Sequence, residues 1–268
     1  MTEKHNKFGC LQDKVALITG AGSGIGKATA LKYAKEGAHV VLLDVKKSAL
    51  ESTYATVRKY GVDCLLIEAD ISNEAELIDA YQQIQQKYGR LDVVYANAGI
   101  NGVLTPIEQM EFNDWNTTVR VNLSGTFLTV KHAIPLLKGI GGSIIITSSI
   151  NGNRVFSNVG FSAYSSTKAG QVAFAKMAAL ELARYKIRVN VICPGAIDTN
   201  IEENTHRQPE LAEVAIPIEF PEGDFPLEDM PGSAQQIAKL ASFLGSDDSS
   251  HISGTSVYID GAESLLRG

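Results

Sequence analysis

Short runs of apolar residues alternate along the chain with longer segments in which apolar residues recur at helical spacing. The apolar runs cover residues 15–18, 39–43, 64–67, 91–95, 143–146 and 187–192. Near-continuous Val, Ile and Leu runs of this length are typical of strands buried on both faces, because helices cover both sides of a parallel sheet. The helical segments between them cover residues 24–36, 74–88, 114–137 and 162–185. This alternation predicts an α/β fold, a doubly wound parallel sheet with helices on both faces.

The alternation is interrupted between residues 200 and 232. This stretch holds five of the eight prolines, which limits long helices there, and the pattern then resumes with a helix near 233–244 and a strand near 256–260. No repeat or flexible linker divides the 268 residues. We therefore expect an N-terminal arm at 1–12 and a single domain at 13–268, with a substrate lid at 200–232. A passive surface loop is the alternative for that stretch.

The acidic residues are concentrated in the same stretch. The chain has a net charge of −6, but residues 200–232 carry nine acidic side chains and one arginine, so they sum to −8 and the rest of the chain to +2. This balance argues against nucleic acid as a partner. It favours neutral or cationic substrates over phosphorylated or carrier-bound ones if Glu202 and Glu203 stand at the cavity entrance. A solvated loop that only aids solubility is the alternative.

Features that the sequence lacks narrow the choice of cellular compartment and of chemistry. The first twelve residues do not resemble a signal peptide, and nowhere do about 18 apolar residues follow one another, so we expect no membrane span. The three cysteines are widely spread and odd in number, which suits a reducing cytoplasm. The five histidines are equally scattered, so we expect no metal site.

A glycine-rich motif follows the first apolar run and leads into the first helical segment. In this motif Gly20 allows a tight turn, Gly24 a close approach of a pyrophosphate, and Gly26 close packing of the helix on the strand. The N–H groups that open the helix attract the phosphates. The motif therefore predicts a Rossmann-type dinucleotide site. Its cofactor-binding positions are Gly20, Ser23, Gly24, Ile25 and Gly26.

The choice of cofactor depends on Asp44, which follows the second apolar run eighteen positions after Gly26. Its carboxylate can accept hydrogen bonds from ribose hydroxyls and would repel a 2′-phosphate, which favours NAD over NADP. Lys46 and Lys47 offer some compensation for a phosphate, whereas Ser23 stands where a basic residue would be expected. A strand-end cap without a ligand is the alternative for Asp44.

Further motifs follow the glycine-rich one along the chain. In order they are Thr19-Gly-x-x-x-Gly-Ile-Gly26, Asn97-Ala-Gly99, Asn122, Ser149, Tyr164-x-x-x-Lys168 and Pro194-Gly195. This set and its order resemble the short-chain dehydrogenase/reductase family, in its compact single-domain branch. The resemblance covers residues 14–261 and implies hydride transfer between a nicotinamide cofactor and an alcohol or ketone. It also implies a homotetramer built on segments including 114–137 and 162–185, with the C-terminus near another subunit.

The pair Tyr164 and Lys168 supplies the chemistry. A free tyrosine has a pKa of about 10 and is a poor base near neutrality. Lys168 lies four residues later, so both side chains share one helix face, and we expect its ammonium to lower the tyrosine pKa and to hold the nicotinamide ribose. Ser149, rather than Ser148, is expected to orient the substrate oxygen. It precedes Tyr164 by fifteen residues, two more than in the family, so the loop at 151–161 departs from the common pattern.

The resemblance also implies further roles. Asn122, in a helix interior that disfavours asparagine, would anchor a water in a proton relay from Lys168, with a satisfied core residue as the alternative. Asp70 and Ile71 would flank the adenine, and Gly99 would allow close approach of the cofactor. The remaining expected cofactor contacts are Asn97, Ala98, Pro194, Gly195, Ile197 and Thr199.

Taken together, the sequence predicts an NAD-dependent oxidoreductase that interconverts a secondary alcohol and a ketone, on a small neutral substrate such as a polyol, sugar or cyclic alcohol. A reductase of 3-oxoacyl thioesters is the alternative within the family, and a non-catalytic NAD-binding regulator is the alternative outside enzymes. Epimerases and dehydratases of the extended branch fit less well, because they carry a longer substrate domain and a differently spaced glycine loop.

Overall fold

The computed structural model describes residues 9–199, 201, 204–217, 220 and 223–267. Its centre is a parallel sheet of seven strands in the order β3-β2-β1-β4-β6-β7-β11. The direction of strand addition reverses between β1 and β4, which confirms the predicted doubly wound sheet. The strands are β1 (Val15–Thr19), β2 (His39–Asp44), β3 (Cys64–Glu68), β4 (Val93–Ala96), β6 (Gly142–Thr147), β7 (Ile187–Pro194) and β11 (Ser256–Ile259).

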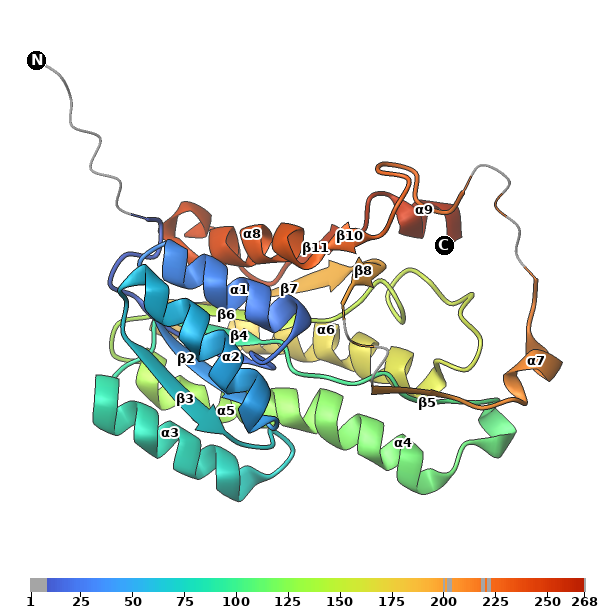
Figure 1. Cartoon of the computed structure of the whole chain (residues 1–268), viewed down its shortest axis with the longest axis horizontal. Helices are drawn as coiled ribbons and strands as arrows, with labels where there is room; N and C mark the ends of the chain where they lie inside the picture. Colours follow the sequence, from blue (N-terminus) through green and yellow to red (C-terminus); the bar gives the residue numbers. More distant parts are fainter. Residues whose placement is uncertain (1–8, 200, 202–203, 218–219, 221–222, 268) are drawn as a thin grey trace, which may run out of the picture.

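Helices cover both faces of this sheet (Figure 1). One face packs against α1 (Gly24–Lys35), α2 (Lys47–Val57) and α8 (Ala234–Gly245). The other face packs against α3 (Glu74–Tyr88), α5 (Gly125–Leu137) and α6 (Ser162–Leu182).

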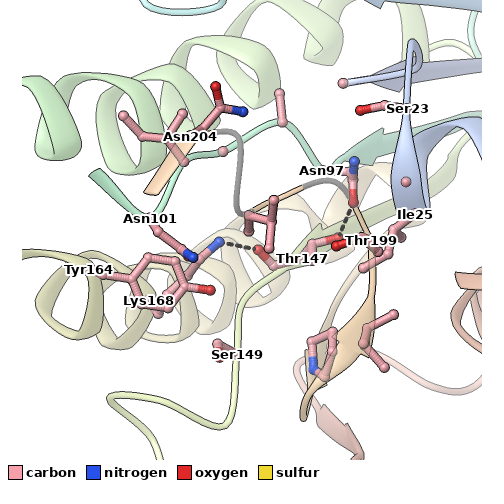
Figure 2. Close-up of a pocket in the computed structure, with 18 of the residues that line it drawn as sticks. Ser23, Ile25, Asn97, Asn101, Thr147, Ser149, Tyr164, Lys168, Thr199 and Asn204 are labelled. Carbon is pink, nitrogen blue, oxygen red and sulfur yellow. Dashed lines mark hydrogen bonds between the residues drawn. The ribbon is translucent and has the colours of Figure 1, made fainter. Parts of the chain in front are cut away.

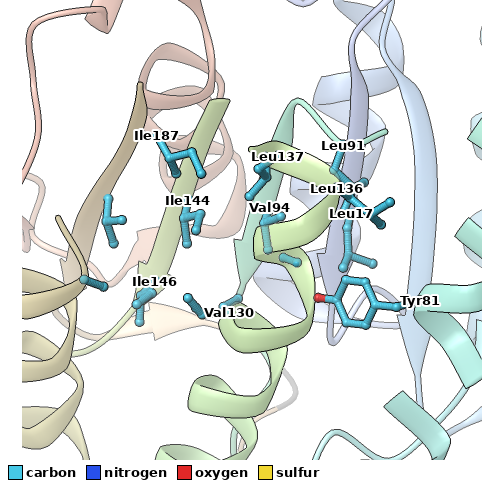
Figure 3. Packing of buried hydrophobic residues seen from close by; sticks show 14 of the residues in the cluster. Leu17, Tyr81, Leu91, Val94, Val130, Leu136, Leu137, Ile144, Ile146 and Ile187 are labelled. Atoms are coloured by element: carbon cyan, nitrogen blue, oxygen red, sulfur yellow. The ribbon is translucent and has the colours of Figure 1, made fainter. Parts of the chain in front are cut away.

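Two apolar cores result, because successive residues of a strand point to opposite faces. In β1, Leu17 belongs to the core under α3, α5 and α6, whereas Ile18 belongs to the core under α1, α2 and α8. Figure 3 shows Leu17, Val94 and Ile144, from three adjacent strands, in one cluster with the α5 residue Val130. These buried strand residues explain why the apolar runs predict the sheet correctly.

Two helices differ from the sequence-based expectation. The helical pattern predicted at 114–137 is interrupted, since α4 (Phe112–Val119) is joined to α5 by a π-helical turn, Arg120–Ser124. Helix α2 is not predicted, because Leu50, Thr53 and Val57 are its only buried side chains.

The predicted lid contains little regular structure among its described residues. Within it, β9 (Thr205–Arg207) runs parallel to β5 (Gly102–Leu104). A second short pair joins β8 (Ile197–Asp198) to β10 (Gly232–Ser233). The stretch also includes α7 (Leu211–Val214), and the chain ends with α9 (Glu263–Arg267).

Candidate active site

A cavity of about 940 Å³ opens at the carboxyl ends of the central strands, where parallel α/β sheets bind ligands. Most of the residues expected at the site line it, although they come from seven separate segments. Gly26 and Asn122 are the exceptions and stand behind the wall. The expected residues that line the cavity are Gly20, Ser23, Gly24, Ile25, Asp44, Asp70, Ile71, Asn97, Ala98, Gly99, Ser149, Tyr164, Lys168, Pro194, Gly195, Ile197 and Thr199.

The glycine-rich motif leaves the start of α1 open toward this cavity. Ser23 is the N-cap residue, but its side chain makes no capping hydrogen bond, so the first N–H groups of the helix are available to an anion. A β-carbon at Gly26 would lie 2.0 Å from the Gly20 carbonyl oxygen, which explains the close packing of the helix on β1. A dinucleotide pyrophosphate fits this open helix end.

Asp44 stands at the end of β2, with both carboxylate oxygens fixed by backbone N–H groups. Oδ2 accepts from Gly22 at 3.0 Å, and Oδ1 accepts from Lys46 at 3.0 Å. The carboxylate therefore lines the cavity in a set orientation, beside the glycine loop. Lys46 also lines the cavity, whereas Lys47 does not.

The segment after β4 ties three strand ends together. The backbone N–H groups of Asn97 and Ala98 donate to Thr19 Oγ1 at 3.0 and 3.1 Å, and Asn97 Oδ1 accepts from Thr147 Oγ1 at 3.1 Å. A β-carbon at Gly99 would lie 3.0 Å from Asn122 Oδ1. Asn97 thus holds the floor of the cavity with its amide, and its contact with a cofactor stays a prediction.

Tyr164, Ser149 and Lys168 meet at one end of the cavity (Figure 2). Tyr164 and Lys168 lie on α6, and both are buried. Lys168 Nζ donates to the Thr147 carbonyl oxygen at 3.0 Å and lies 5.4 Å from the centre of the Tyr164 ring. The expectation that these residues share one face of a helix is confirmed.

The pKa of Tyr164 differs from the expectation. Burial raises it to about 12, and a hydrogen bond with Ser149 offsets this only in part. Burial also lowers the pKa of Lys168 to about 8. Removal of the phenol from water is therefore the largest effect on the pKa of the tyrosine, and the lysine ammonium does not bring that pKa below 10 here. Tyr164 holds its proton at neutral pH.

The structure distinguishes the two serines after β6. Ser148 Oγ donates to the Lys168 carbonyl oxygen at 2.8 Å and accepts from Asn153 Nδ2 at 3.1 Å, so it is engaged in holding the loop. Ser149 Oγ accepts from the Asn151 N–H at 3.1 Å and interacts with Tyr164. Ser149 is therefore the serine next to the tyrosine hydroxyl.

Asn122 lies in the π-helical turn and is completely buried. Its Oδ1 accepts from the Ile100 N–H at 2.9 Å, while its Nδ2 donates to the Ile100 carbonyl at 2.9 Å and to Thr167 Oγ1 at 3.2 Å. Its own carbonyl accepts from Thr126 and Gln171. These contacts make Asn122 a residue that positions the cavity wall, and its part in a proton relay stays a prediction.

Sequence reasoning misses the carboxylate of Glu263, which also lines the cavity. Glu263 begins α9, is buried, and accepts a hydrogen bond from the Ala196 N–H at 2.8 Å. A β-carbon at Gly195 would lie 2.6 Å from its Oε2. Glu263 thus fastens the chain end to the loop after β7, a contact that no local pattern indicates.

The end of the cavity around Tyr164 is also largely missed. Its wall comes from loops that approach each other only in the folded chain. These residues are Asn101, Asn151, Asn158, Phe161, Ile201, Asn204 and Met230.

The acidic stretch contributes no carboxylate to the cavity among its described residues. The members that line it are Ile201, Asn204, Met230 and Pro231. Glu202 and Glu203 lie outside the described residues, as does Asn200. The described part of this stretch therefore gives the cavity apolar and amide groups rather than negative charge.

The described part of the chain offers neither a metal-binding cluster nor a membrane-spanning helix. It holds no group of three His, Cys, Asp or Glu side chains arranged for a metal. None of its helices is both long enough and apolar enough to span a membrane. The three cysteines are free thiols.

Comparisons with known proteins agree with the geometry. The family model of short chain dehydrogenases matches residues 14–210. Levodione reductase from Leifsonia aquatica is 37% identical over 261 residues, covering 94% of each chain. A crystal structure of a 3-ketoacyl-ACP reductase from Sinorhizobium meliloti 1021 is 47% identical with a TM-score of 0.91, covering 94% of this chain and 100% of that one. A 3-ketoacyl-(acyl-carrier-protein) reductase from Brucella melitensis, complexed with NADH, is 31% identical with a TM-score of 0.83, covering 95% of this chain and 99% of that one.

Proposed function

The chain belongs to the short-chain dehydrogenase/reductase family, and from this premise we propose that it is an NAD-dependent enzyme interconverting a secondary alcohol and a ketone. One observation carries the proposal. Ser149, Tyr164 and Lys168 meet in the same cavity that the open end of α1 and Asp44 line. A site for a dinucleotide and a proton donor are therefore adjacent.

Ser149, Tyr164 and Lys168 each have a separate role in the proposed reaction. A bound nicotinamide dinucleotide supplies the hydride acceptor or donor at this site. Ser149 hydrogen-bonds to the substrate oxygen, and the phenol of Tyr164 gives its proton to that oxygen in reduction or takes the proton in oxidation. The buried Lys168 holds a positive charge beside the ring and stabilises the phenolate when the proton has left. Because burial raises the pKa of Tyr164 to about 12, the protonated form that reduction needs dominates at neutral pH.

The preference for NAD is supported by Asp44. Its carboxylate lines the cavity next to the glycine loop, where a 2′-phosphate on the ribose would meet a fixed negative charge. Lys46 lines the same end, so we expect NAD to be preferred without NADP being excluded completely. The complex of the Brucella melitensis relative with NADH agrees with this choice.

Small neutral substrates, such as polyols, sugars or cyclic alcohols, are the class that we propose. The relative named levodione reductase supports a ketone substrate of low mass, whereas two structural relatives named for acyl-carrier substrates support 3-oxoacyl thioesters as the alternative. The sequence offers an acidic rather than a basic stretch near the site, and acidic carriers dock on basic surfaces.

We also propose a homotetramer in the cytoplasm. Apolar side chains are exposed on α5 and α6, where Phe127 is 45%, Met177 66% and Leu180 78% exposed. Leu265 on α9 is 72% exposed as well. Faces of this kind are typical of subunit interfaces. The free thiols of the three cysteines suit a reducing compartment.

The proposed function is tested with a panel of secondary alcohols and ketones, together with acetoacetyl-CoA, assayed with NAD and NADP by absorbance of the reduced cofactor. We expect turnover of small neutral alcohols, with NAD preferred. Turnover of the thioester alone would support the alternative substrate. NAD binding without turnover of any member would favour the regulator and contradict the proposal.

A further inference from the structure

The cavity carries four asparagine side chains beyond the cofactor segment. Asn101 precedes β5, Asn151 and Asn158 lie between β6 and α6, and Asn204 precedes β9. Building on the proposed function, we infer that this amide-rich wall selects polyhydroxylated substrates, polyols or sugars. Asn151 and Asn158 recognise a hydroxyl of the substrate on the carbon next to the reacting one.

Asn151 and Asn158 act as a pair. Asn158 Nδ2 donates to Asn151 Oδ1 at 2.8 Å. Among the described residues, no protein group accepts from Asn151 Nδ2 or donates to Asn158 Oδ1, and both side chains are partly exposed and line the cavity. The pair therefore offers an unused donor group, Asn151 Nδ2, and an unused acceptor atom, Asn158 Oδ1. A hydroxyl group satisfies both, whereas a carbonyl can only accept and an alkyl chain satisfies neither.

The backbone fixes this pair close to the reacting oxygen. The Asn151 N–H donates to Ser149 Oγ at 3.1 Å, so the asparagine is one hydrogen bond away from the serine that binds the substrate oxygen. Gly152 packs the loop on α6 so tightly that a β-carbon would lie 2.1 Å from the Ser165 carbonyl oxygen. The position of Asn151 is therefore set before the substrate arrives.

Asn101 adds a third amide near the catalytic pair. Figure 2 shows Asn101 beside Tyr164 and Lys168. Its Nδ2 donates to Thr205 Oγ1 at 2.8 Å, which holds the side chain against β9. Asn101 belongs to the cavity wall although it is only 7% exposed. Its position suits contact with a more distant hydroxyl of a polyol.

The charges of the described wall disfavour an anionic substrate, because four carboxylates line it, those of Asp44, Asp70, Asp198 and Glu263. Its only cations are Lys46 and Lys168, and no arginine lines it. Lys46 lies at the far end beside Asp44, and Lys168 is buried and donates to a backbone carbonyl. A phosphate or carboxylate on the substrate is recognised best by an arginine or a free lysine. The hydroxyls are therefore expected on a substrate without phosphate.

Matched alcohols test this inference. The kcat/KM values with NAD are measured for cyclohexanol against cis-cyclohexane-1,2-diol, and for butan-2-ol against butane-2,3-diol and xylitol. We expect wild type to prefer the diols by at least about tenfold, which corresponds to one hydrogen bond of about 1.4 kcal/mol. Asn151→Ala and Asn158→Ala should each lower this ratio by about tenfold, and Asn151→Ala retains the N–H that binds Ser149.

The controls separate the possible failures. Asn113→Ala, on the exposed face of α4, should leave the diol preference unchanged. If wild type oxidises the mono-alcohols as well as the diols, the inference is overturned while the proposed function stands. If the cofactor binds but neither kind of alcohol nor any ketone reacts, the proposed function fails instead. The wild-type ratio needs no substitution, so a variant that does not fold leaves the test intact.

Discussion

Lys168→Met is expected to stabilise the protein at neutral pH although it removes a residue of the proposed catalytic set. The Lys168 side chain is 4% exposed, and the hydrogen bond that holds its ammonium goes to a neutral carbonyl, that of Thr147. Burial lowers its pKa from 10.5 to about 8. A charged group without a paired charge is costly to bury, and the pKa shift measures that cost.

The magnitude follows from the two pKa values. The folded state binds fewer protons than the unfolded state between pH 8 and 10.5, so the cost is fully present below pH 8 and disappears above 10.5. It amounts to about 3 kcal/mol at pH 7. Loss of the hydrogen bond to Thr147 destabilises the variant by about 1 kcal/mol and offsets part of this gain. Lys168→Met should therefore raise the free energy of unfolding by about 2 kcal/mol at pH 7 and by almost nothing at pH 10.

Urea unfolding at pH 7 and pH 10 measures this difference, with Lys176→Met as the control. Lys176 lies on the same helix and is exposed, so its replacement should give no pH-dependent gain. A Lys168→Met protein that is less stable than wild type at pH 7 would show that the buried charge of Lys168 does not destabilise the folded protein. An equal gain at both pH values would refute it as well, because the gain would then not come from the buried charge.

Three further substitutions test separate parts of the structure. Asp44→Ala should raise the kcat/KM ratio of NADP to NAD by about tenfold or more, because a fixed negative charge leaves the cofactor site, and an unchanged ratio would remove Asp44 from this role. Gly26→Ala should cost about 2 kcal/mol of stability in thermal unfolding, since its β-carbon would lie 2.0 Å from the Gly20 carbonyl oxygen; Gly139→Ala, with open space around it, is the control. Met177→Lys should shift the mass measured by light scattering to a smaller assembly, and an unchanged mass would exclude this face from the interface.

The fold could be predicted from the sequence because the strands are buried on both faces. Continuous apolar runs such as the one ending at Ile18 leave little choice of structure, and the glycine motif fixes where α1 begins. The π-helical turn at Asn122 could not be predicted as such, since the flanking segments keep helical spacing across it. The only sign of this turn in the sequence is Asn122, an unfavourable residue in a helix interior.

The two halves of the site differ in how much the sequence reveals. The cofactor half consists of motifs that each follow a strand, so their positions can be deduced from the order of strands. The half around Tyr164, where we propose that the substrate binds, includes Asn101, Asn158 and Met230, which are far apart in the chain and follow no periodic pattern. The direction of the Tyr164 pKa shift could not be deduced either, because it depends on how completely the folded protein excludes water.

In the proposed NAD-dependent reaction, Tyr164 exchanges a proton with the substrate oxygen. Tyr164→Phe removes only the phenolic hydroxyl, so NAD binding by calorimetry should remain close to that of wild type. The rate of NADH formation from the best alcohol should fall by about 100-fold to 10,000-fold, the usual contribution of a positioned acid or base. A Tyr164→Phe protein that forms NADH at the wild-type rate would contradict the role of Tyr164 as the proton donor and acceptor.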